Sequence, residues 1–259
     1  MEQKAINLNG LQVHYKITGS ADKPAILILH GWGSSSDSWV KIQEMLAARK
    51  YLVIIPDLPG FGKTPAPQSI WGVEEYTDFI RRFTQTLGLE GFILLGHSFG
   101  GQTAAHFTVQ YPETVEKLIL FAPAIVRRKT GFKEYILRYF AKFFGFFLYL
   151  IPFEDLRNNI RNAFYMFIRR RDYARTQGIM KDIFKKVITQ DATALCPQIK
   201  VPTLIIWGDK DVATPIQDAY TIKERIAGSS LTVIPGQGHN LHFVVPDQFV
   251  QTITQFLRP

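Results

Sequence analysis

The chain has 259 residues, which is enough for one large α/β domain or for such a domain with a small insertion. Hydrophobic residues make up 46% of it and charged residues 20%, a composition that excludes a globally disordered protein. The single cysteine, Cys196, excludes an intramolecular disulfide, and we expect it to be structural and to lie in a loop. The N-terminal residues show no signal-peptide pattern and no apolar run reaches the ~18 residues of a membrane span, so we predict a cytoplasmic protein.

Strand-like and helix-like segments alternate along most of the chain. Asn9-Gly10 separates two strand-like runs and suits the tight turn of a hairpin. Apolar runs without alternation, typical of strands buried on both faces of a parallel sheet, occupy residues 25–29, 51–55, 92–95, 118–121, 203–207 and 231–234. Helix-like segments occupy residues 37–50, 73–87, 101–110, 216–226 and 246–257. The pattern predicts an α/β fold with a mostly parallel central sheet flanked by helices and the hairpin at one edge.

Residues 127–196 interrupt this alternation. The formal net charge of the chain is +8, and the stretch from Ile125 to Cys196 holds 15 lysines and arginines but only 6 acidic residues. This stretch is also aromatic and helix-like, and it contains no run typical of a buried strand. We interpret it as a helical cap that divides the chain into core residues 1–126, cap residues 127–196 and core residues 197–259.

Ser98 is the candidate nucleophile. It is the centre of Gly-His-Ser-Phe-Gly, residues 96–100, between the predicted strand 92–95 and the predicted helix 101–110. The two glycines remove side chains that would collide where a strand turns sharply into a helix and exposes a reactive serine. The alternative is a glycine-rich turn in which Ser98 merely caps the helix.

A serine nucleophile needs a base, and the base needs an orienting acid. In sheets of this kind an acidic residue and then a histidine follow the serine, each on a loop after a later strand. We select His239, after the run 231–234, as the base, with His242 as its rival. For the acid we select Asp211 over Asp209, because we expect Asp209 to form a turn by bonding its own backbone.

Two backbone N–H groups are predicted to stabilise the oxyanion. One belongs to Phe99, directly after the nucleophile, and the other to Trp32 in His-Gly-Trp-Gly, residues 30–33. The alternative for residues 30–33 is a simple tight turn. His97 is not a candidate base, because neighbours on an extended strand point in opposite directions. It belongs to a group of polar residues that we expect to be structural: His14, His30, Asp57, His97 and His106.

Five motifs in this order resemble those of the α/β-hydrolase fold superfamily. They lie at residues 29–33, 57–62, 96–101, 207–211 and 238–242. The resemblance implies Ser98, Asp211 and His239 as a catalytic triad and Trp32 and Phe99 as oxyanion donors. The sequence shows no metal-binding cluster and no phosphate-binding loop, so we expect no cofactor. Epoxide hydrolases and haloalkane dehalogenases carry aspartate in place of the serine. The chain is therefore similar to the cap-containing branch with carboxylesterases, lactonases, carbon–carbon bond hydrolases and cofactor-free haloperoxidases.

The cap segment contains an uncharged aromatic run at residues 143–153, which is too short to span a bilayer. We interpret this run as a lid helix whose aromatic side covers the active site. The alternative is an interfacial helix in weak contact with a membrane surface, with basic residues 169–171 and 185–186 facing anionic head groups, and both interpretations can hold together. No nucleic-acid-binding module accompanies the basic residues, so we predict no nucleic-acid partner.

An aromatic cover over the site favours apolar substrate groups. We therefore predict a hydrolase that cleaves carboxylic esters of small to medium hydrophobic substrates through an acyl-enzyme on Ser98. One alternative is a lactonase with the same residues. Another is a carbon–carbon bond hydrolase, which would need polar groups in its pocket. From a different class, the alternative is a non-catalytic ligand- or lipid-binding protein.

Overall fold

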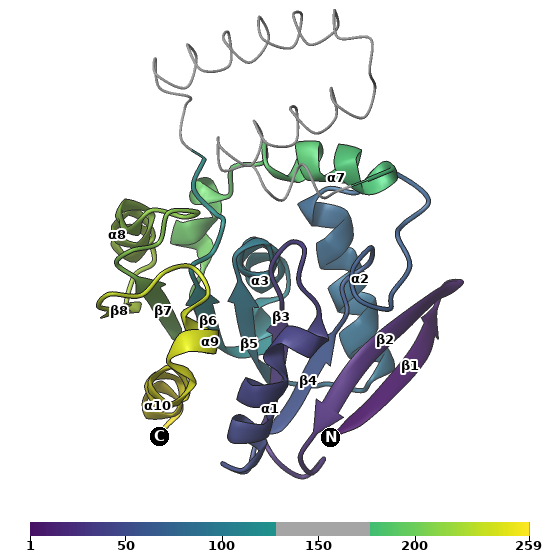
Figure 1. The fold of residues 1–259 in the computed structure, drawn as a ribbon, viewed down its shortest axis with the longest axis horizontal. Coiled ribbons are helices and arrows are strands. Elements are labelled where there is room, and N and C mark those ends of the chain that lie inside the picture. Colours follow the sequence, from purple (N-terminus) through teal and green to yellow (C-terminus); the bar gives the residue numbers. More distant parts are fainter. Residues whose placement is uncertain (128–176, 259) are drawn as a thin grey trace, which may run out of the picture.

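An eight-stranded sheet is the centre of the computed structural model, which describes residues 1–127 and 177–258 (Figure 1). Its strand order is β1-β2-β4-β3-β5-β6-β7-β8. The strands are β1 (Glu2–Leu8), β2 (Leu11–Thr18), β3 (Ala25–Leu29), β4 (Leu52–Pro56), β5 (Phe92–His97), β6 (Val115–Phe121), β7 (Thr203–Gly208) and β8 (Ser230–Ile234). β2 pairs antiparallel with β1 and with β4, and the other neighbouring strands pair in parallel. The predicted mostly parallel sheet with an edge hairpin is confirmed.

Helices cover both faces of this sheet (Figure 1). α1 (Val40–Ala47) contacts α10 (Pro246–Leu257) on one face, and α2 (Val73–Thr86) contacts α3 (Phe99–Gln110) on the other. α8 (Ile216–Arg225) follows β7, and the short α9 (Leu241–Val244) follows β8. Every residue of β3, β4, β5 and β7 is buried, which explains why their sequences are apolar without alternation.

Two local expectations are wrong. The predicted helix 37–50 consists of a 3₁₀ helix, η1 (Ser36–Trp39), followed by α1, with a break at Trp39, whose φ of −112° and ψ of 0° are not helical. The ring of Trp39 is buried in the core, and this packing outweighs the helical pattern. Cys196 lies in another 3₁₀ helix, η3 (Thr193–Gln198), rather than in a loop. It is buried and burial raises the pKa of its thiol to about 11, as expected of a structural cysteine.

Helix α7 (Ile179–Val187) belongs to the predicted cap segment and lies on the core. Lys186 Nζ forms an ion pair with Glu75 at 3.0 Å, and the side chain of Gln190 accepts a hydrogen bond from the N–H of Val73 at 2.9 Å. Both contacts fasten α7 to the N-terminal end of α2. The rest of the predicted cap, with the aromatic run 143–153 and basic residues 169–171, lies outside the described residues, and the domain boundaries remain predictions.

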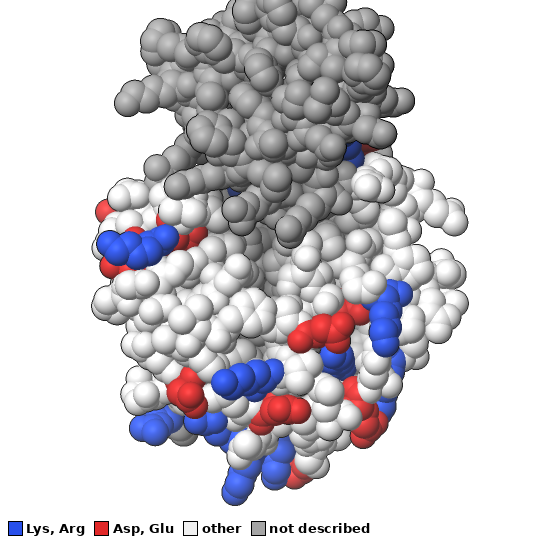
Figure 2. Space-filling model, viewed as in Figure 1, with Lys and Arg blue, Asp and Glu red and all other residues white. Residues whose placement is uncertain are grey.

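The described surface is unevenly charged. On the face that Figure 2 shows, lysine, arginine, aspartate and glutamate side chains gather toward the lower part, whereas the upper middle of the described surface is mainly uncharged. Among the described residues, no helix combines the length and the hydropathy needed to cross a membrane.

Candidate active site

Ser98 occupies a strained turn between β5 and α3. Its φ of 53° and ψ of −115° are unusual for a residue with a side chain. The turn is fixed by the backbone, since the N–H of Ser98 donates to the carbonyl of Phe121 at 3.1 Å and its carbonyl accepts from the N–H of Ala124 at 2.9 Å. Ser98 is the N-cap residue of α3, but its side chain makes no capping hydrogen bond. The alternative that the serine hydroxyl serves to cap the helix is therefore wrong.

The two glycines of the turn are required by close backbone contacts. A Cβ atom on Gly100 would lie 2.3 Å from the carbonyl oxygen of Leu29, and a Cβ atom on Gly96 would lie 2.4 Å from the carbonyl oxygen of Gly100. Real side chains are not found at such distances from backbone atoms. The glycines thus allow α3 to start directly against β3, as the sequence pattern predicts.

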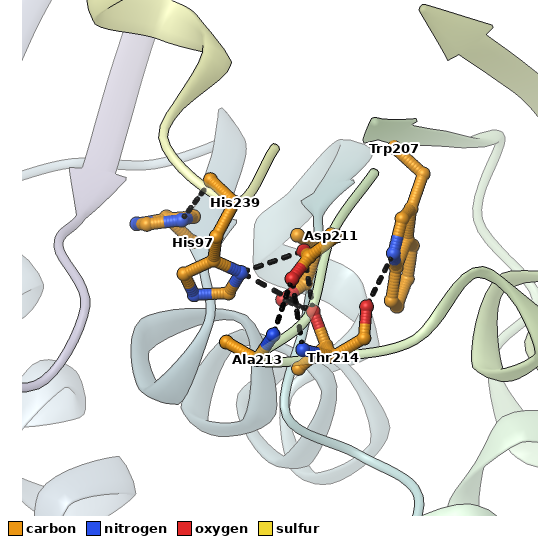
Figure 3. A network of polar contacts seen from close by, with 7 residues as sticks. His97, Trp207, Asp211, Ala213, Thr214 and His239 are labelled. Atoms are coloured by element: carbon orange, nitrogen blue, oxygen red, sulfur yellow. Dashed lines mark hydrogen bonds and ion pairs between the residues drawn. The ribbon is translucent and has the colours of Figure 1, made fainter. Parts of the chain in front are cut away.

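Asp211 and His239 form a close pair in the same region (Figure 3). Asp211 Oδ2 lies 2.7 Å from His239 Nδ1, and the aspartate side chain is completely buried. The carboxylate can only accept, so His239 Nδ1 carries the proton, and in the neutral form of the ring Nε2 is the acceptor. Since 19% of the His239 side chain is exposed, a substrate can reach this ring. Asp211 and His239 are therefore in direct contact, as expected.

Thr214 also contacts the carboxylate of Asp211, and it was not among the site residues predicted from the sequence. Its hydroxyl donates to Asp211 Oδ2 at 2.8 Å and lies 3.3 Å from His239 Nδ1. Asp211 Oδ1 accepts from the N–H groups of Ala213 and Thr214 at 2.8 and 2.9 Å. The bond from the N–H of Ala213, two residues after Asp211, is a common turn of aspartate, but this pattern does not mark Thr214 as a partner of the carboxylate.

Asp209 does not have the role expected of it. Its Oδ1 accepts a hydrogen bond from the N–H of Gly236 at 2.6 Å, in the loop that precedes His239. Asp209 therefore joins the two loops of the site, and it is Asp211 that accepts from its own nearby backbone. The choice of Asp211 over Asp209 as the partner of the histidine agrees with this geometry.

The rival histidine, His242, lies in the core rather than beside the carboxylate. Its ring stacks on Trp39, with the ring centres 4.5 Å apart. It is buried, and within the described part of the chain its Nδ1 has no hydrogen-bond partner. Burial lowers the pKa of His242 to about 3, so the ring stays neutral at ordinary pH.

Replacing His242 by phenylalanine is expected to make the protein less sensitive to acid. The unfolded chain protonates this histidine below pH ~6.5, whereas the native state does not until pH falls to about 3. Its contribution to the free energy of unfolding is thus fully present above pH ~6.5 and falls by about 1.4 kcal/mol per pH unit between these values. Thermal unfolding at pH 7 and pH 5 should show a smaller drop in Tm for the variant. Equal drops in the variant and the parent protein would contradict this account.

His30 and Asp57 have the expected structural roles. His30 Nε2 accepts from the N–H of Leu58 at 3.0 Å, and its Nδ1 donates to the carbonyl of Gly31 at 2.9 Å. Asp57 accepts from the N–H groups of Ser36 and Lys63 at 2.7 and 2.9 Å. Together these contacts hold the loops that follow β3 and β4. Neither residue contacts Asp211 or His239 through a hydrogen bond in the described structure.

His97 has a contact that the sequence could not reveal. Its Nε2 donates a hydrogen bond to the backbone carbonyl of His239 at 3.1 Å. Its ring lies against Phe121, at 4.4 Å between ring centres, and against His239, at 4.7 Å (Figure 3). Burial, above all, and the neighbouring His239 keep the pKa of His97 well below its ordinary value. His97 therefore supports the loop of His239 as a neutral ring.

The predicted oxyanion donors lie next to Ser98. Phe99 is the first residue of α3, which begins two residues earlier than predicted, and an N–H group at this position has no acceptor within the helix. The loop that contains Trp32 also approaches Ser98, because a Cβ atom on Gly31 would lie 3.2 Å from the Cβ of Ser98. The Trp32 ring contacts Phe99 with 5.4 Å between ring centres. Both peptide segments thus border the serine.

One cleft of ≈ 1160 Å³ brings these residues together. Its lining includes Ser98, His239, Trp32 and Phe99, together with apolar side chains from α7. Asp211 lies behind His239, where its side chain is buried. A serine, a histidine paired with a buried carboxylate, and backbone N–H groups beside the serine are the parts needed for nucleophilic attack on a carbonyl group. The described residues contain no cluster of histidine, cysteine and acidic side chains arranged to hold a metal ion.

The chain belongs to the alpha/beta hydrolase fold family, whose model matches residues 24–246. Lipase 1 of Psychrobacter immobilis is 25% identical to it, in an alignment that covers 92% of this chain and 78% of the lipase. A 2-hydroxy-6-oxononadienedioate/2-hydroxy-6-oxononatrienedioate hydrolase of Burkholderia vietnamiensis is 27% identical over 96% of this chain and 91% of the relative.

A solved structure has the same architecture. The enol-lactonase from Burkholderia xenovorans LB400 superposes with a TM-score of 0.76 at 21% identity, covering 98% of this chain and 99% of the lactonase. At this identity the likeness concerns the fold. The relatives carry different hydrolytic activities on one architecture, so the substrate has to be argued from the cleft.

Proposed function

We propose that this protein is a serine hydrolase that cleaves carboxylic esters of small to medium hydrophobic substrates. The observation that carries the proposal is the 2.7 Å contact between His239 Nδ1 and the buried carboxylate of Asp211, in a cleft that Ser98 also lines. This contact leaves His239 Nε2 as the basic atom on the exposed part of the ring. The strained turn at Ser98 supports the assignment, because such strain is concentrated at functional sites.

The proposed reaction proceeds through an acyl-enzyme. His239 Nε2 takes the proton of the Ser98 hydroxyl while the oxygen attacks the ester carbonyl carbon. The N–H groups of Phe99 and Trp32 donate to the resulting oxyanion, and Asp211 stabilises the imidazolium. When the tetrahedral intermediate collapses, the bond to the alcohol oxygen breaks and His239 gives its proton to the leaving alkoxide. Water then attacks the acyl-enzyme with His239 as base, releasing the acid and restoring the serine.

Apolar side chains support the preference for hydrophobic esters. The cleft lining includes Trp32 and Phe99 from the core, Phe184 and Val187 from α7, and Phe243 from α9. The Phe184 ring lies 4.9 Å from that of Trp32, measured between ring centres, so α7 extends the aromatic wall of the core. Such a wall favours acyl or alcohol groups without charge along most of their length.

Labelling with a fluorophosphonate tests this function against a non-catalytic binding protein. An activated serine attacks the phosphorus and retains the phosphonyl group, whereas an ordinary serine does not react. We expect one label per chain, located by peptide mass spectrometry on the peptide containing Ser98. Ser34, Ser35 and Ser38 line the same cleft and are internal controls for mere accessibility. Labelling spread over these serines, or none at all, would count against a catalytic site.

A lactonase is the second candidate, because a cyclic ester can be opened by the same residues without change. A panel of lactones and open-chain esters of matched size, assayed in parallel, separates the two activities. A carbon–carbon bond hydrolase would need polar groups in the cleft, and Gln102 and Arg127 are such groups in its lining. Release of an acid from a vinylogous diketone, without turnover of esters, would favour that activity.

A further inference from the structure

Arg127 follows β6 and is held at the edge of the cleft by several hydrogen bonds. Its Nε donates to the carbonyl of Gln190 at 3.2 Å, and its Nη2 donates to Gln102 Oε1 at 2.8 Å and to the carbonyl of Val187 at 3.3 Å. Gln102 is held in turn, since its Nε2 donates to the carbonyl of Gln190 at 2.7 Å. These bonds fix the plane of the guanidinium group and leave the two N–H groups of Nη1 without an acceptor among the described residues.

The charge of Arg127 has no direct counterion in the described structure. All the acceptors of its guanidinium group are neutral, and the carboxylate of Asp191 accepts from the backbone N–H of Arg127 instead. Burial is the main influence on the pKa of Arg127 and lowers it, whereas the nearby carboxylates of Asp191 and Asp218 raise it, and the arginine remains charged at any ordinary pH. No carboxylate among the described residues bonds the guanidinium group directly, so this partly buried cation can still accept a hydrogen-bonded anion.

The charged residues that line the cleft also favour the binding of an anionic group. Arg127 is the only lysine or arginine among the described residues of the lining, and Asp37 is the only acidic one. Asp37 forms an ion pair with Lys16, so its charge is already balanced. Within the described lining, an anionic group on a ligand would therefore meet one fixed cation and no unpaired carboxylate.

We propose that Arg127, oriented by Gln102, binds a carboxylate carried by the substrate at the end of the acyl chain remote from the scissile carbonyl. The inference rests on the proposed function and narrows its substrate class to hydrophobic acyl groups with an acidic end. Gln102 is four residues after Ser98, about 6 Å along the axis of α3, and its N–H donates to the carbonyl of Ser98. The apolar side chains of Phe184 and Val187 line the same cleft as Ser98 and Arg127.

The hydrogen bonds to Val187 and Gln190 also attach the C-terminal end of α7 to the core, which is a structural role. That role uses Nε and Nη2 and does not account for Nη1. It makes the guanidinium group a rigid, preorganised donor, which is the property that a specificity site requires.

The test compares two p-nitrophenyl esters of equal acyl length, the hexanoate and the monoester of adipic acid, after correction for spontaneous hydrolysis. Monoesters of pimelic and suberic acid are paired in the same way with the heptanoate and the octanoate. We expect kcat/KM to be at least about tenfold higher for the acidic ester at one of these lengths, as one well-formed charge-assisted contact allows. In Arg127→Gln the ratio of acidic to neutral ester should fall to one or below.

Lys186→Gln is the matched control. It removes one cation from the C-terminal end of α7, the end that Arg127 also contacts, and weakens the attachment of α7 to Glu75, but Lys186 does not line the cleft. Its ratio should equal that of the parent protein. A parent protein that prefers the neutral ester at all three lengths would overturn the proposal, as would a preference for the acidic ester that persists in Arg127→Gln. If Arg127→Gln does not fold, Arg127→Lys serves instead, with a reduced ratio expected because lysine lacks the planar fork.

Binding measured by calorimetry separates this proposal from the proposed function. The monoanilide of adipic acid should bind at least about tenfold more tightly than the anilide of hexanoic acid, and the difference should disappear in Arg127→Gln. This result would hold even if no ester were hydrolysed, in which case only the proposed function would fail. Equal affinities for the two anilides in the parent protein would refute the carboxylate subsite.

Discussion

Replacing Ser98 by alanine is expected to lower kcat/KM for p-nitrophenyl butyrate by about 10⁴- to 10⁶-fold, the range found when the nucleophile of such a triad is removed. Without the hydroxyl no acyl-enzyme can form, so the remaining rate is that of water attack assisted by the oxyanion donors alone. Steady-state hydrolysis followed at 400 nm measures the effect. The change should fall on kcat far more than on KM, because the hydroxyl contributes little to binding the ester.

Ser98→Gly controls for the fold of the turn. Glycine also lacks the hydroxyl, but it adopts the φ of 53° without the strain that both serine and alanine carry. We expect Ser98→Gly to be as inactive as Ser98→Ala and more stable by about 1 kcal/mol, measured by chemical denaturation. Activity within tenfold of the parent protein in either variant would disprove the acyl-enzyme mechanism.

The second large effect is expected for Asp211→Asn, with a fall in kcat of about 10⁴-fold. The asparagine amide keeps the shape of the side chain but does not hold the proton on His239 Nδ1, so the population with Nε2 as the base decreases. The hydroxyl of Thr214 and the N–H of Ala213 lose a charged acceptor as well. Steady-state hydrolysis of p-nitrophenyl butyrate by the variant and by the parent protein measures the effect.

Asp209→Asn is the matched control for this result. Asp209 lies two residues away and bonds the N–H of Gly236, without contact to His239 through a hydrogen bond in the described structure. An amide oxygen can replace its carboxylate in this bond, so we expect less than a tenfold change in kcat. A larger loss in Asp209→Asn than in Asp211→Asn would reverse the assignment of the acid.

The parts of this site that local patterns encode were predictable from the sequence. The strained turn at Ser98 requires glycine at fixed positions, and the loop of Asp211 follows β7, a fully buried strand whose apolar run marks its end. Chain order and the ends of the predicted strands are therefore enough to place Ser98, Asp211 and His239 at one edge of the sheet. The start of α3 at Phe99 needed only the recognition that the turn itself begins the helix.

The parts that depend on contacts between distant segments were not predictable. His97 reaches the carbonyl of His239 across 142 residues of sequence, and Arg127 reaches Gln190 across 63. Neither the spacing nor the type of these residues indicates from the sequence that they are in contact. The break at Trp39 has the same origin, because a buried ring that stacks on His242 decides where the helix begins. Whether a polar side chain is buried among aromatic ones depends on how distant helices and strands pack together, so it cannot be predicted from local sequence.

The hydrogen bond from His97 to the carbonyl of His239 has a mechanical consequence. His97 and Ser98 are consecutive residues, so a displacement of the end of β5 moves both of them together. Because His97 is hydrogen-bonded to the backbone carbonyl of His239, the same displacement also moves His239 in the direction in which Ser98 moves. We therefore expect small movements of β5 to change the positions of Ser98 and His239 in the molecule more than the distance between them. In the proposed reaction, this coupling would keep Ser98 and His239 aligned for proton transfer while the sheet moves.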